Sequence, residues 1–123
     1  MTVAASSARV VLVMSASEDE AIKIARVLVE ERLAACVNVV GPVRSVYRWR
    51  GAIEDAREHL LIIKIRAHMY AKVERRVKEL HSYEVPEVIA LPLAGGSRRY
   101  LEWLLEATAM ERRAAKSRQP VGS

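Results

Sequence analysis

The sequence predicts one α+β domain in which strands and helices alternate around a single sheet. Two apolar runs without polar alternation, residues 10–14 and 60–65, are typical of central strands that are buried on both faces. An amphipathic helical pattern follows each run, and a long extended stretch lies between them. The resulting order is that of a ferredoxin-like βαββαβ sandwich with an additional C-terminal helix. Right-handed crossovers would place both main helices on one sheet face and leave the other face uncovered.

The first helix is expected from residue 18 to about residue 32. Ser17 and Glu20 form a capping box at its start, and the acidic residues of the first turn favour the positive end of a helix. Four apolar residues recur at helical spacing: Ala21, Ala25, Leu28 and Val29. This stripe would cover one face of the sheet.

A long β-hairpin is predicted between the two main helices. After a bend at residues 41–42 the chain alternates between a largely apolar face and a largely charged face. The two sets are Val43, Ser45, Tyr47 and Trp49, and Arg44, Val46, Arg48 and Arg50. The distal turn is expected over residues 51–55. Residues 36–49 would span about 45 Å, whereas a compact chain of this length has a radius of gyration of about 14 Å. The hairpin would therefore overhang its own core, and an uncovered apolar strand predicts an obligate oligomer.

The second half of the chain adds two helices and a strand. The second helix, residues 68–81, carries Met69, Val73, Val77 and Leu80 on one side, and the short strand 88–91 lies between two prolines. Ser97 is a suitable N-cap for a last helix over residues 98–110. That helix has a second apolar stripe besides the one that would face the sheet: Tyr100, Trp103 and Ala107. We expect this second stripe to meet another subunit.

Composition limits the function classes that fit the chain. The net charge of +5 depends mostly on residues 111–123, because residues 1–110 hold 16 basic and 14 acidic residues. We therefore expect one domain over residues 1–110, a disordered basic tail over residues 111–123, and no nucleic-acid partner. The single cysteine suits a reducing compartment, and neither a secretory signal nor a membrane-spanning run is present. The expected protein is soluble and cytoplasmic.

Five segments carry a resemblance to a known family. They are EERLAACVN at 30–38, SVYRWRG at 45–51, IK at 63–64, YEVPEVIALP at 83–92 and YLEWL at 100–104. In this order and spacing they resemble the CutA family of divalent-cation tolerance proteins. The resemblance implies a tight homotrimer closed by strand pairing, a cytoplasmic location, and a link to copper or other divalent metals. It implies no established enzyme activity.

The resemblance also indicates where a metal would be sought. Some family members have a cysteine at the end of the first strand and two histidines after the second helix as suggested copper ligands. Here these positions hold Met14 and the single imidazole of His81. Strong sites use three or four well-placed ligands, so we expect copper or another divalent metal to bind weakly, through His81 with Glu84 and the sulfur of Met14. His59 and His68 are expected to face solvent.

A second group of residues is expected at a pocket or interface between subunits: Cys36, Asn38, Tyr47, Trp49, Lys64, Tyr83, Glu87 and Trp103. Cys36 suits either an inert buried thiol or a ligand, and Lys64 would either reach solvent or pair with a carboxylate of another subunit. Aromatic residues are enriched at subunit contacts, which favours an interface role for Tyr47 and Trp49. Glu84 and Glu87 could form a carboxylate pair, but no partner indicates acid–base chemistry.

Three alternative functions can be compared. An RNA-recognition module would need aromatic residues on the central strands, and an acylphosphatase-like enzyme would need a phosphate cradle after the first strand; both are absent. The remaining alternative is a trimer similar to the PII signal proteins, which binds a small metabolite or nucleotide between subunits. The residues do not decide between this and a metal-tolerance protein.

Overall fold

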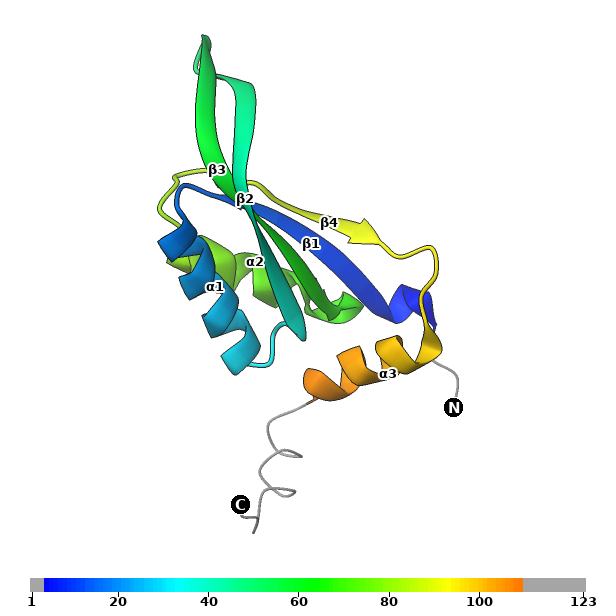
Figure 1. Cartoon of the computed structure of the whole chain (residues 1–123). Helices are drawn as coiled ribbons and strands as arrows, with labels where there is room; N and C mark the ends of the chain where they lie inside the picture. The colour runs from blue at the N-terminus through cyan, green and yellow to red at the C-terminus, as the bar shows by residue number, and fades with distance from the viewer. Residues whose placement is uncertain (1–3, 110–123) are drawn as a thin grey trace.

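The computed structural model of this protein describes residues 4–109, so the expected basic tail lies outside the described residues. The predicted order of strands and helices is present (Figure 1). The strands are β1 (Ala8–Ser15), β2 (Cys36–Trp49), β3 (Ala52–Arg66) and β4 (Val88–Pro92). The helices are α1 (Glu18–Glu30), α2 (Tyr70–Leu80) and α3 (Arg98–Ala107), with short 3-10 turns at Ala5–Ser7 and Ala67–Met69. None of the helices described is long and apolar enough to span a bilayer.

One four-stranded sheet has the order β2-β3-β1-β4, and each neighbouring pair is antiparallel. The two continuous apolar runs therefore form the two central strands, as predicted. Val11 pairs with Ile63 on one side and with Ala90 on the other. β2 and β4 are the edge strands, and each keeps one side of its backbone unpaired within the described chain.

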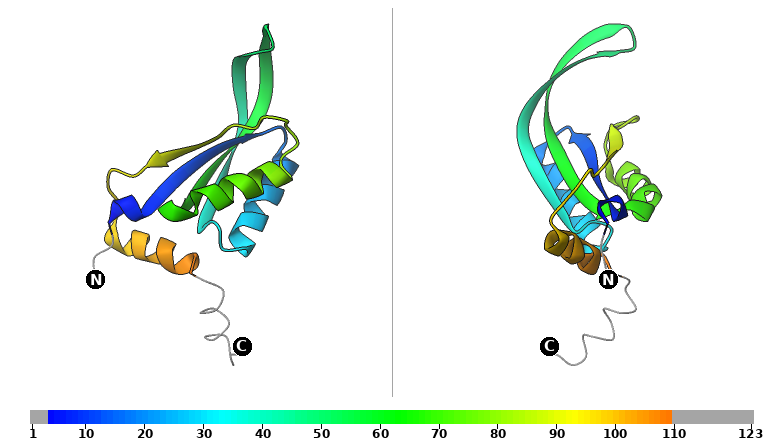
Figure 2. Two further views of the ribbon diagram at one scale, coloured as in Figure 1. Left: turned by 180° about the vertical axis from the view of Figure 1, so that it is seen from behind. Right: turned by 90° about the vertical axis from the view of Figure 1, so that its right-hand side faces the viewer.

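Both main helices pack on the same sheet face and form the core with it. The core is made of side chains that are fully or almost fully buried: Val11, Val13, Ala21, Ile24, Leu28, Ala34, Leu61, Ile63, Ile65, Val73 and Val77. α3 lies across one end of the sheet (Figures 1 and 2), where Leu101 and Leu104 pack with Ala8 and Ala35 in a second cluster. Burial of this apolar surface is the main force that holds the layers together.

Two predictions, about α1 and about the hairpin turn, were wrong. Val29 was expected to face the sheet but is 43% exposed, whereas Ile24, outside the predicted stripe, is fully buried. The distal turn was expected over residues 51–55, but β3 already begins at Ala52. Arg50 and Gly51 both adopt positive φ, 51° and 83°. Two left-handed residues make the tight turn that matches the twist of a hairpin, so pairing resumes directly after them.

The hairpin of β2 and β3 projects beyond the rest of the domain, as predicted (Figures 1 and 2). Its pairing continues from Cys36 opposite Lys64 to Trp49 opposite Ala52. Beyond the helices, no helix of the described residues covers the inner face, and Tyr47 and Trp49 are each 40% exposed. The largely apolar face predicted for the hairpin is thus partly exposed to solvent in a single chain.

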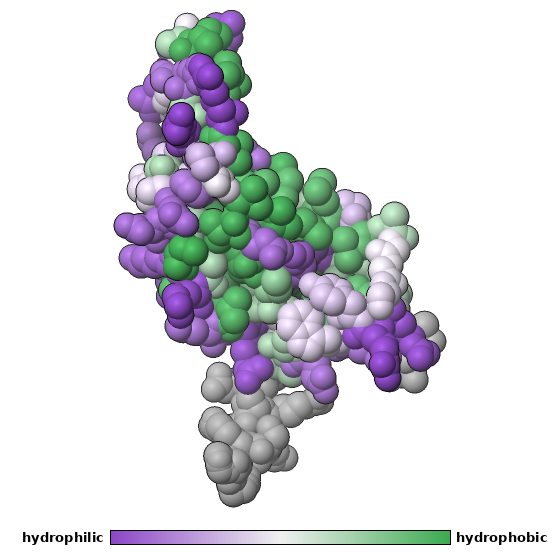
Figure 3. Space-filling view, viewed as in Figure 1, coloured by the Kyte–Doolittle hydropathy of each residue, from purple (hydrophilic) through white to green (hydrophobic). Residues whose placement is uncertain are grey.

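The sheet face turned away from α2 is also open. Figure 3 shows apolar side chains gathered over the central part of the molecule, where Figure 1 shows strands without a helix in front of them. Exposed apolar residues occur on both edge strands and on α3: Val40, Ile89, Leu91, Tyr100 and Trp103. A contiguous apolar area of this kind is typical of an interaction surface.

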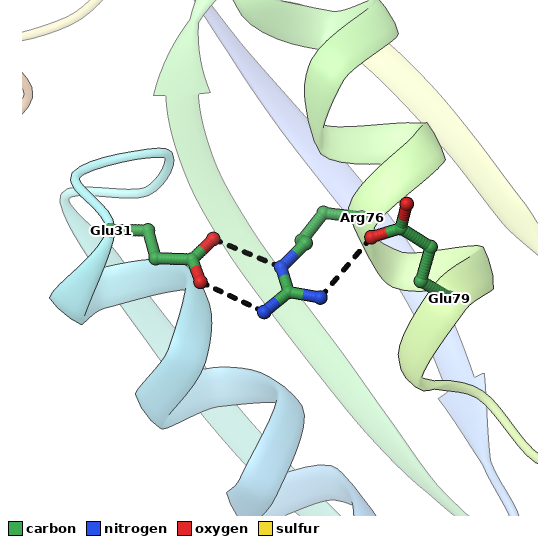
Figure 4. Close-up of polar contacts among 3 residues, drawn as sticks. All are labelled: Glu31, Arg76 and Glu79. Atoms are coloured by element: carbon green, nitrogen blue, oxygen red, sulfur yellow. Dashed lines mark hydrogen bonds and ion pairs between the residues drawn. The ribbon is translucent and has the colours of Figure 1, made fainter.

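A charged clamp links the outer sides of α1 and α2 (Figure 4). Arg76 donates two hydrogen bonds to the carboxylate of Glu31, at 3.0 and 2.8 Å, and a third to Glu79 at 3.1 Å. These bonds raise the pKa of Arg76, and the hydrogen bond from Arg76 lowers the pKa of Glu31. The bidentate geometry fixes the spacing of the two helices, although exposure to solvent weakens the pairing.

His59 does not face solvent, contrary to the prediction. Its ring is half buried and its Nδ1 atom is buried without a hydrogen-bond partner among the described residues. The ring packs on Gly41, at the point where the β2–β3 register shifts between Val40 and Val43. A Cβ atom at Gly41 would lie less than 3.0 Å from three ring atoms of His59. His68, by contrast, is exposed as predicted.

This contact predicts a specific cost for a methyl group at Gly41. We expect Gly41→Ala to lower the free energy of unfolding by about 1–3 kcal/mol, the usual range for overpacking. Adding His59→Ala should recover part of the loss, because the clashing ring is removed. Gly95→Ala is the matched control, since nothing lies within 4 Å of its Cβ position. Equal denaturation midpoints for Gly41→Ala and Gly95→Ala would contradict the interpretation.

Candidate functional site

A cleft of about 620 Å³ lies where the hairpin leaves the core. It is bounded by the inner face of the hairpin, the end of β1, and the loop between α2 and β4. Its lining combines aromatic, apolar and acidic side chains: Met14, Tyr47, Trp49, Arg50, Glu58, Ser82, Tyr83, Glu84, Val85 and Glu87. Its size and composition are those of a small-molecule site.

A carboxylate and a phenol of the cleft lining are hydrogen-bonded to each other. Glu58, on β3, is only 5% exposed, and its Oε2 accepts a hydrogen bond of 2.7 Å from the hydroxyl of Tyr83. Burial, together with the hydrogen bond and the charge of Glu58, raises the pKa of Tyr83 well above its usual range. Tyr83 therefore remains protonated at physiological pH and donates to Glu58.

An ion pair closes the rim of the cleft. Arg50, in the hairpin turn, pairs with Glu84 of the opposite loop at 2.8 Å. The guanidinium of Arg50 also lies 5.2 Å from the centre of the Trp49 ring, in a cation–π arrangement. Both side chains of the pair are largely exposed, so the contact orients the hairpin tip more than it stabilises the fold.

Glu20 holds the cleft loop in place from α1. Its Oε1 accepts from the hydroxyl of Ser15 at 2.6 Å, and its Oε2 accepts from the backbone N–H of Ser82 at 2.7 Å. Burial raises the pKa of Glu20, but the hydrogen bonds from Ser15 and Ser82 outweigh it, so the pKa lies below its ordinary value. Half of the predicted capping box forms, because Ser17 Oγ accepts from Glu20 N–H. The Glu20 carboxylate does not bond to Ser17 N–H as a capping box requires; it accepts from Ala16 N–H at 3.3 Å and from the loop instead.

The structure brings the predicted metal residues to the same region. Met14 and Glu84 line the cleft, and His81 lies at its edge. Both ring nitrogens of His81 are engaged, because Nε2 donates to the carbonyl of Met14 at 2.7 Å and Nδ1 accepts from the N–H of Tyr83 at 3.0 Å. A metal at His81 would have to displace one of these bonds. Within residues 4–109 no group of three His, Cys, Asp or Glu side chains is placed to hold a metal ion.

The eight predicted pocket or interface residues fall into two places. Tyr47, Trp49, Tyr83 and Glu87 line the cleft. The other four lie toward the α3 end of the open face: Cys36, Asn38, Lys64 and Trp103. Lys64 Nζ donates to Asn38 Oδ1 and lies 4.0 Å from the sulfur of Cys36, while Trp103 packs on Tyr100 with ring centres 5.4 Å apart. An interface role for these residues stays a prediction.

Sequence reasoning missed two important cleft residues, Glu58 and Arg50. The sequence does contain a pattern that indicates Glu58. It precedes the apolar run of β3 and lies on the same strand face as Leu60 and Ile62, because alternate residues of a strand share a face. An acid at that position, paired with Val43 of β2, must lie on the inner face of the hairpin. No local signal indicates Arg50, whose position depends on the tight turn and on Glu84, 34 residues away.

These features define a class of small α+β proteins with one open sheet face. They are an antiparallel sheet with two helices on one face, an overhanging hairpin, and a cleft beneath it. Residues 9–107 match the family described as CutA1 divalent ion tolerance protein. The divalent-cation tolerance protein CutA of Thermus thermophilus is 52% identical over 99 residues, which are 80% of this chain and 96% of that protein. The chain therefore belongs to the CutA family.

Solved structures and a plant relative extend the comparison. The Thermus thermophilus structure superposes with a TM-score of 0.80 at 51% identity and covers 83% of this chain and 99% of its own. A structure described as the periplasmic divalent cation tolerance protein CutA from Archaeoglobus fulgidus has a TM-score of 0.81 at 37% identity, with coverage of 83% and 99%. Protein CutA, chloroplastic, of Arabidopsis thaliana is 50% identical over 86 residues, 70% of this chain; the match spans about half (47%) of that relative's length.

The Glu58–Tyr83 bond predicts a stability effect at the cleft. Tyr83→Phe removes the one side-chain hydrogen bond that Glu58 receives among the described residues, so we expect a loss of about 1–3 kcal/mol in the free energy of unfolding. Tyr100→Phe is the control, because the Tyr100 hydroxyl makes no hydrogen bond within residues 4–109. Chemical denaturation measures both variants, and an equal effect would show that the bond contributes nothing specific.

Proposed function

We propose that the protein is a ferredoxin-like, homotrimeric and cytoplasmic protein of divalent-cation tolerance. In this proposal it binds copper or another divalent metal weakly and catalyses no reaction. Membership of the CutA family supports the link to divalent cations. The main support for an oligomer is the open apolar sheet face, because a stable monomer would not leave such a face uncovered.

The edges of the sheet support a trimer closed by strand pairing. β2 and β4 each offer an unpaired backbone side, and natural proteins normally cover or pair such edges. The hairpin extends β2 beyond the core, so its outer half can reach a neighbouring molecule. Trp49 and Tyr47 on its inner face are suitable anchors, since half-exposed aromatic residues gain most from burial at an interface.

Weak metal binding follows from how the candidate ligands are already used. Both nitrogens of His81 are hydrogen-bonded and Glu84 is paired with Arg50, so a metal must compete with existing contacts. Met14 adds a thioether, which suits Cu(I) better than harder ions.

A second candidate function is a regulatory trimer, similar to the PII proteins, that binds a small metabolite or nucleotide between subunits. The cleft itself favours it. Aromatic walls and a buried carboxylate are typical of a site for an organic molecule rather than a metal centre.

The oligomer can be tested directly. We expect light scattering at low micromolar concentration to give about three times 13.8 kDa. Trp49→Ala should weaken assembly by on the order of 2 kcal/mol, as for a buried aromatic anchor. Arg48→Ala, on the opposite face of the same strand, is the matched control. A folded monomer that persists at this concentration would refute the trimer.

Metal binding is tested by titration calorimetry with Cu(II) and Zn(II). We expect dissociation constants weaker than micromolar, a further loss in His81→Ala, and no change in the exposed control His68→Ala. Because protons compete with metal ions for the ligand atoms, acidification should weaken whatever binding exists. Submicromolar binding, or binding unchanged in His81→Ala, would place the site elsewhere.

A further inference from the structure

The open face of the sheet has two opposite charges on β3, one toward the hairpin and one toward α3. The core side chains of this strand alternate from Leu61 to Ile65. Because successive residues of a strand point to opposite faces, Glu58 and Lys64 lie together on the other, open face. They are six positions apart, which is about 20 Å along a strand. The two groups therefore cannot pair with each other within one chain.

The surface between the two charges is apolar. Leu60 and Ile62 lie between them on β3, and the edge strands add Val40, Ile89 and Leu91, which are between 45% and 47% exposed. The trimer proposed above would cover this area and exclude water from both charges. A charge that loses its water is costly unless an opposite charge compensates it. Assembly therefore favours an arrangement that pairs them.

Neither charge has an oppositely charged partner within residues 4–109. Glu58 is 5% exposed, and the one side-chain hydrogen bond it receives there comes from the neutral hydroxyl of Tyr83. Lys64 is half-buried, and its Nζ donates to the amide oxygen of Asn38 and lies 4.0 Å from the sulfur of Cys36. The six ion pairs of the described residues include neither group.

Lys64 is also the basic group of the open face that remains available. Of the basic residues on the described strands, Lys64 and Arg66 point to this face. Arg66 donates to Thr108 Oγ1 at 2.9 Å and so holds the end of α3. Arg50, in the hairpin turn, pairs with Glu84. A neighbouring copy would therefore present Lys64 as the countercharge for a buried acid.

The symmetry of a closed trimer requires that two different surfaces meet at each interface, because neighbouring copies in a ring of three are joined head to tail. The open face supplies two such surfaces, an acidic end at the base of the hairpin and a basic end near α3. Figure 2 shows that the hairpin projects beyond its own domain, so it can extend over another copy. Contact between the acidic end and the basic end of the next copy brings opposite charges together at every interface.

We propose that Glu58 of each copy pairs with Lys64 of the partner subunit, so that a second copy completes the cleft. Asn38 of the partner subunit and Cys36 of the partner subunit reach the cleft together with this lysine, because they contact it within their own chain. The two groups of predicted pocket residues, which lie apart in one chain, then form one site between copies. The inference rests on the proposed trimer, and it names two residues that join its subunits.

The first test is a double-mutant cycle on the full chain. Glu58→Gln and Lys64→Met each leave one charge unpaired, so we expect each to lower the melting temperature at equal protein concentration. The double variant should lose less than the sum of the two shifts, because neither charge remains. Effects of residues about 20 Å apart in one chain normally add, so a smaller loss indicates contact between copies. Additive shifts would overturn the proposal.

The second test asks whether the compensation occurs between copies. The variants Glu58→Gln and Lys64→Met, one of them isotope-labelled, are unfolded together and refolded, and native mass spectrometry counts the trimer compositions. A homotrimer of either variant has three unpaired charges, whereas a mixed trimer has one. We expect mixed trimers to exceed the random share of about three quarters. A defect within each chain would persist on mixing, so a random distribution would overturn the proposal.

Lys72→Met is the matched control for both tests, since Lys72 is exposed on the outer side of α2. Its effect should add to that of Glu58→Gln in the cycle. When these two variants are mixed, the number of unpaired charges rises evenly with the share of the Glu58 variant. Their trimers should therefore have the random composition.

The outcomes separate this inference from the proposed trimer. If light scattering gives trimers but neither test shows coupling, the trimer stands and the Glu58–Lys64 pair fails. If the preference for mixed assembly occurs in dimers, the pair stands and the trimer fails. Variants that assemble only when mixed support the pair as well, whereas a folded monomeric parent would overturn both.

Discussion

The long pairing of β2 with β3, interrupted only by the register shift between Val40 and Val43, is the constraint on which the rest of the structure depends. The ladder continues through the register shift at Val40 and ends only at the tight turn after Trp49. Two helices of 13 and 11 residues cannot cover strands of 14 and 15 residues, because a helix rises less than half as far per residue as a strand. The outer part of the ladder therefore lies outside the core and is held by backbone hydrogen bonds and by exposed ion pairs such as Arg44–Asp55 and Arg50–Glu84. Its apolar inner face must find cover elsewhere.

The cleft forms where this ladder leaves the core. At that point the sheet still supplies buried backbone on one side, while the loop after α2 supplies the other wall and Glu20 fixes it. A side chain here is desolvated by the sheet without being enclosed by helices. This position explains why Glu58 is buried and yet lines an open space. A charge in a partly dry site interacts more strongly with a bound ion than the exposed acids of the rim do.

The sequence predicts the layers well because their signals are periodic and extend over many residues. Both central strands, both main helices and the overhang follow from apolar runs, helical spacing and strand length. Predictions failed where the outcome was the position of one individual side chain. Ile24 and not Val29 faces the sheet, because a helix of 13 residues can rotate slightly about its axis and still keep an apolar stripe on the sheet. The position of His59 depends on the register shift opposite it, and that of Glu58 depends on which residues the folded chain brings near it.

The attraction of the cleft for a cation depends on which of its acidic side chains lack a positively charged partner among the described residues. Glu84 is paired with Arg50 and is exposed, so water and the guanidinium already satisfy it. Glu87 is also exposed, and a cation bound there would remain largely hydrated. Glu58 is buried and forms no ion pair within residues 4–109, and its side chain receives one hydrogen bond there, from the neutral hydroxyl of Tyr83. A positively charged partner from outside the described chain would therefore gain more at Glu58 than at the exposed acids of the rim.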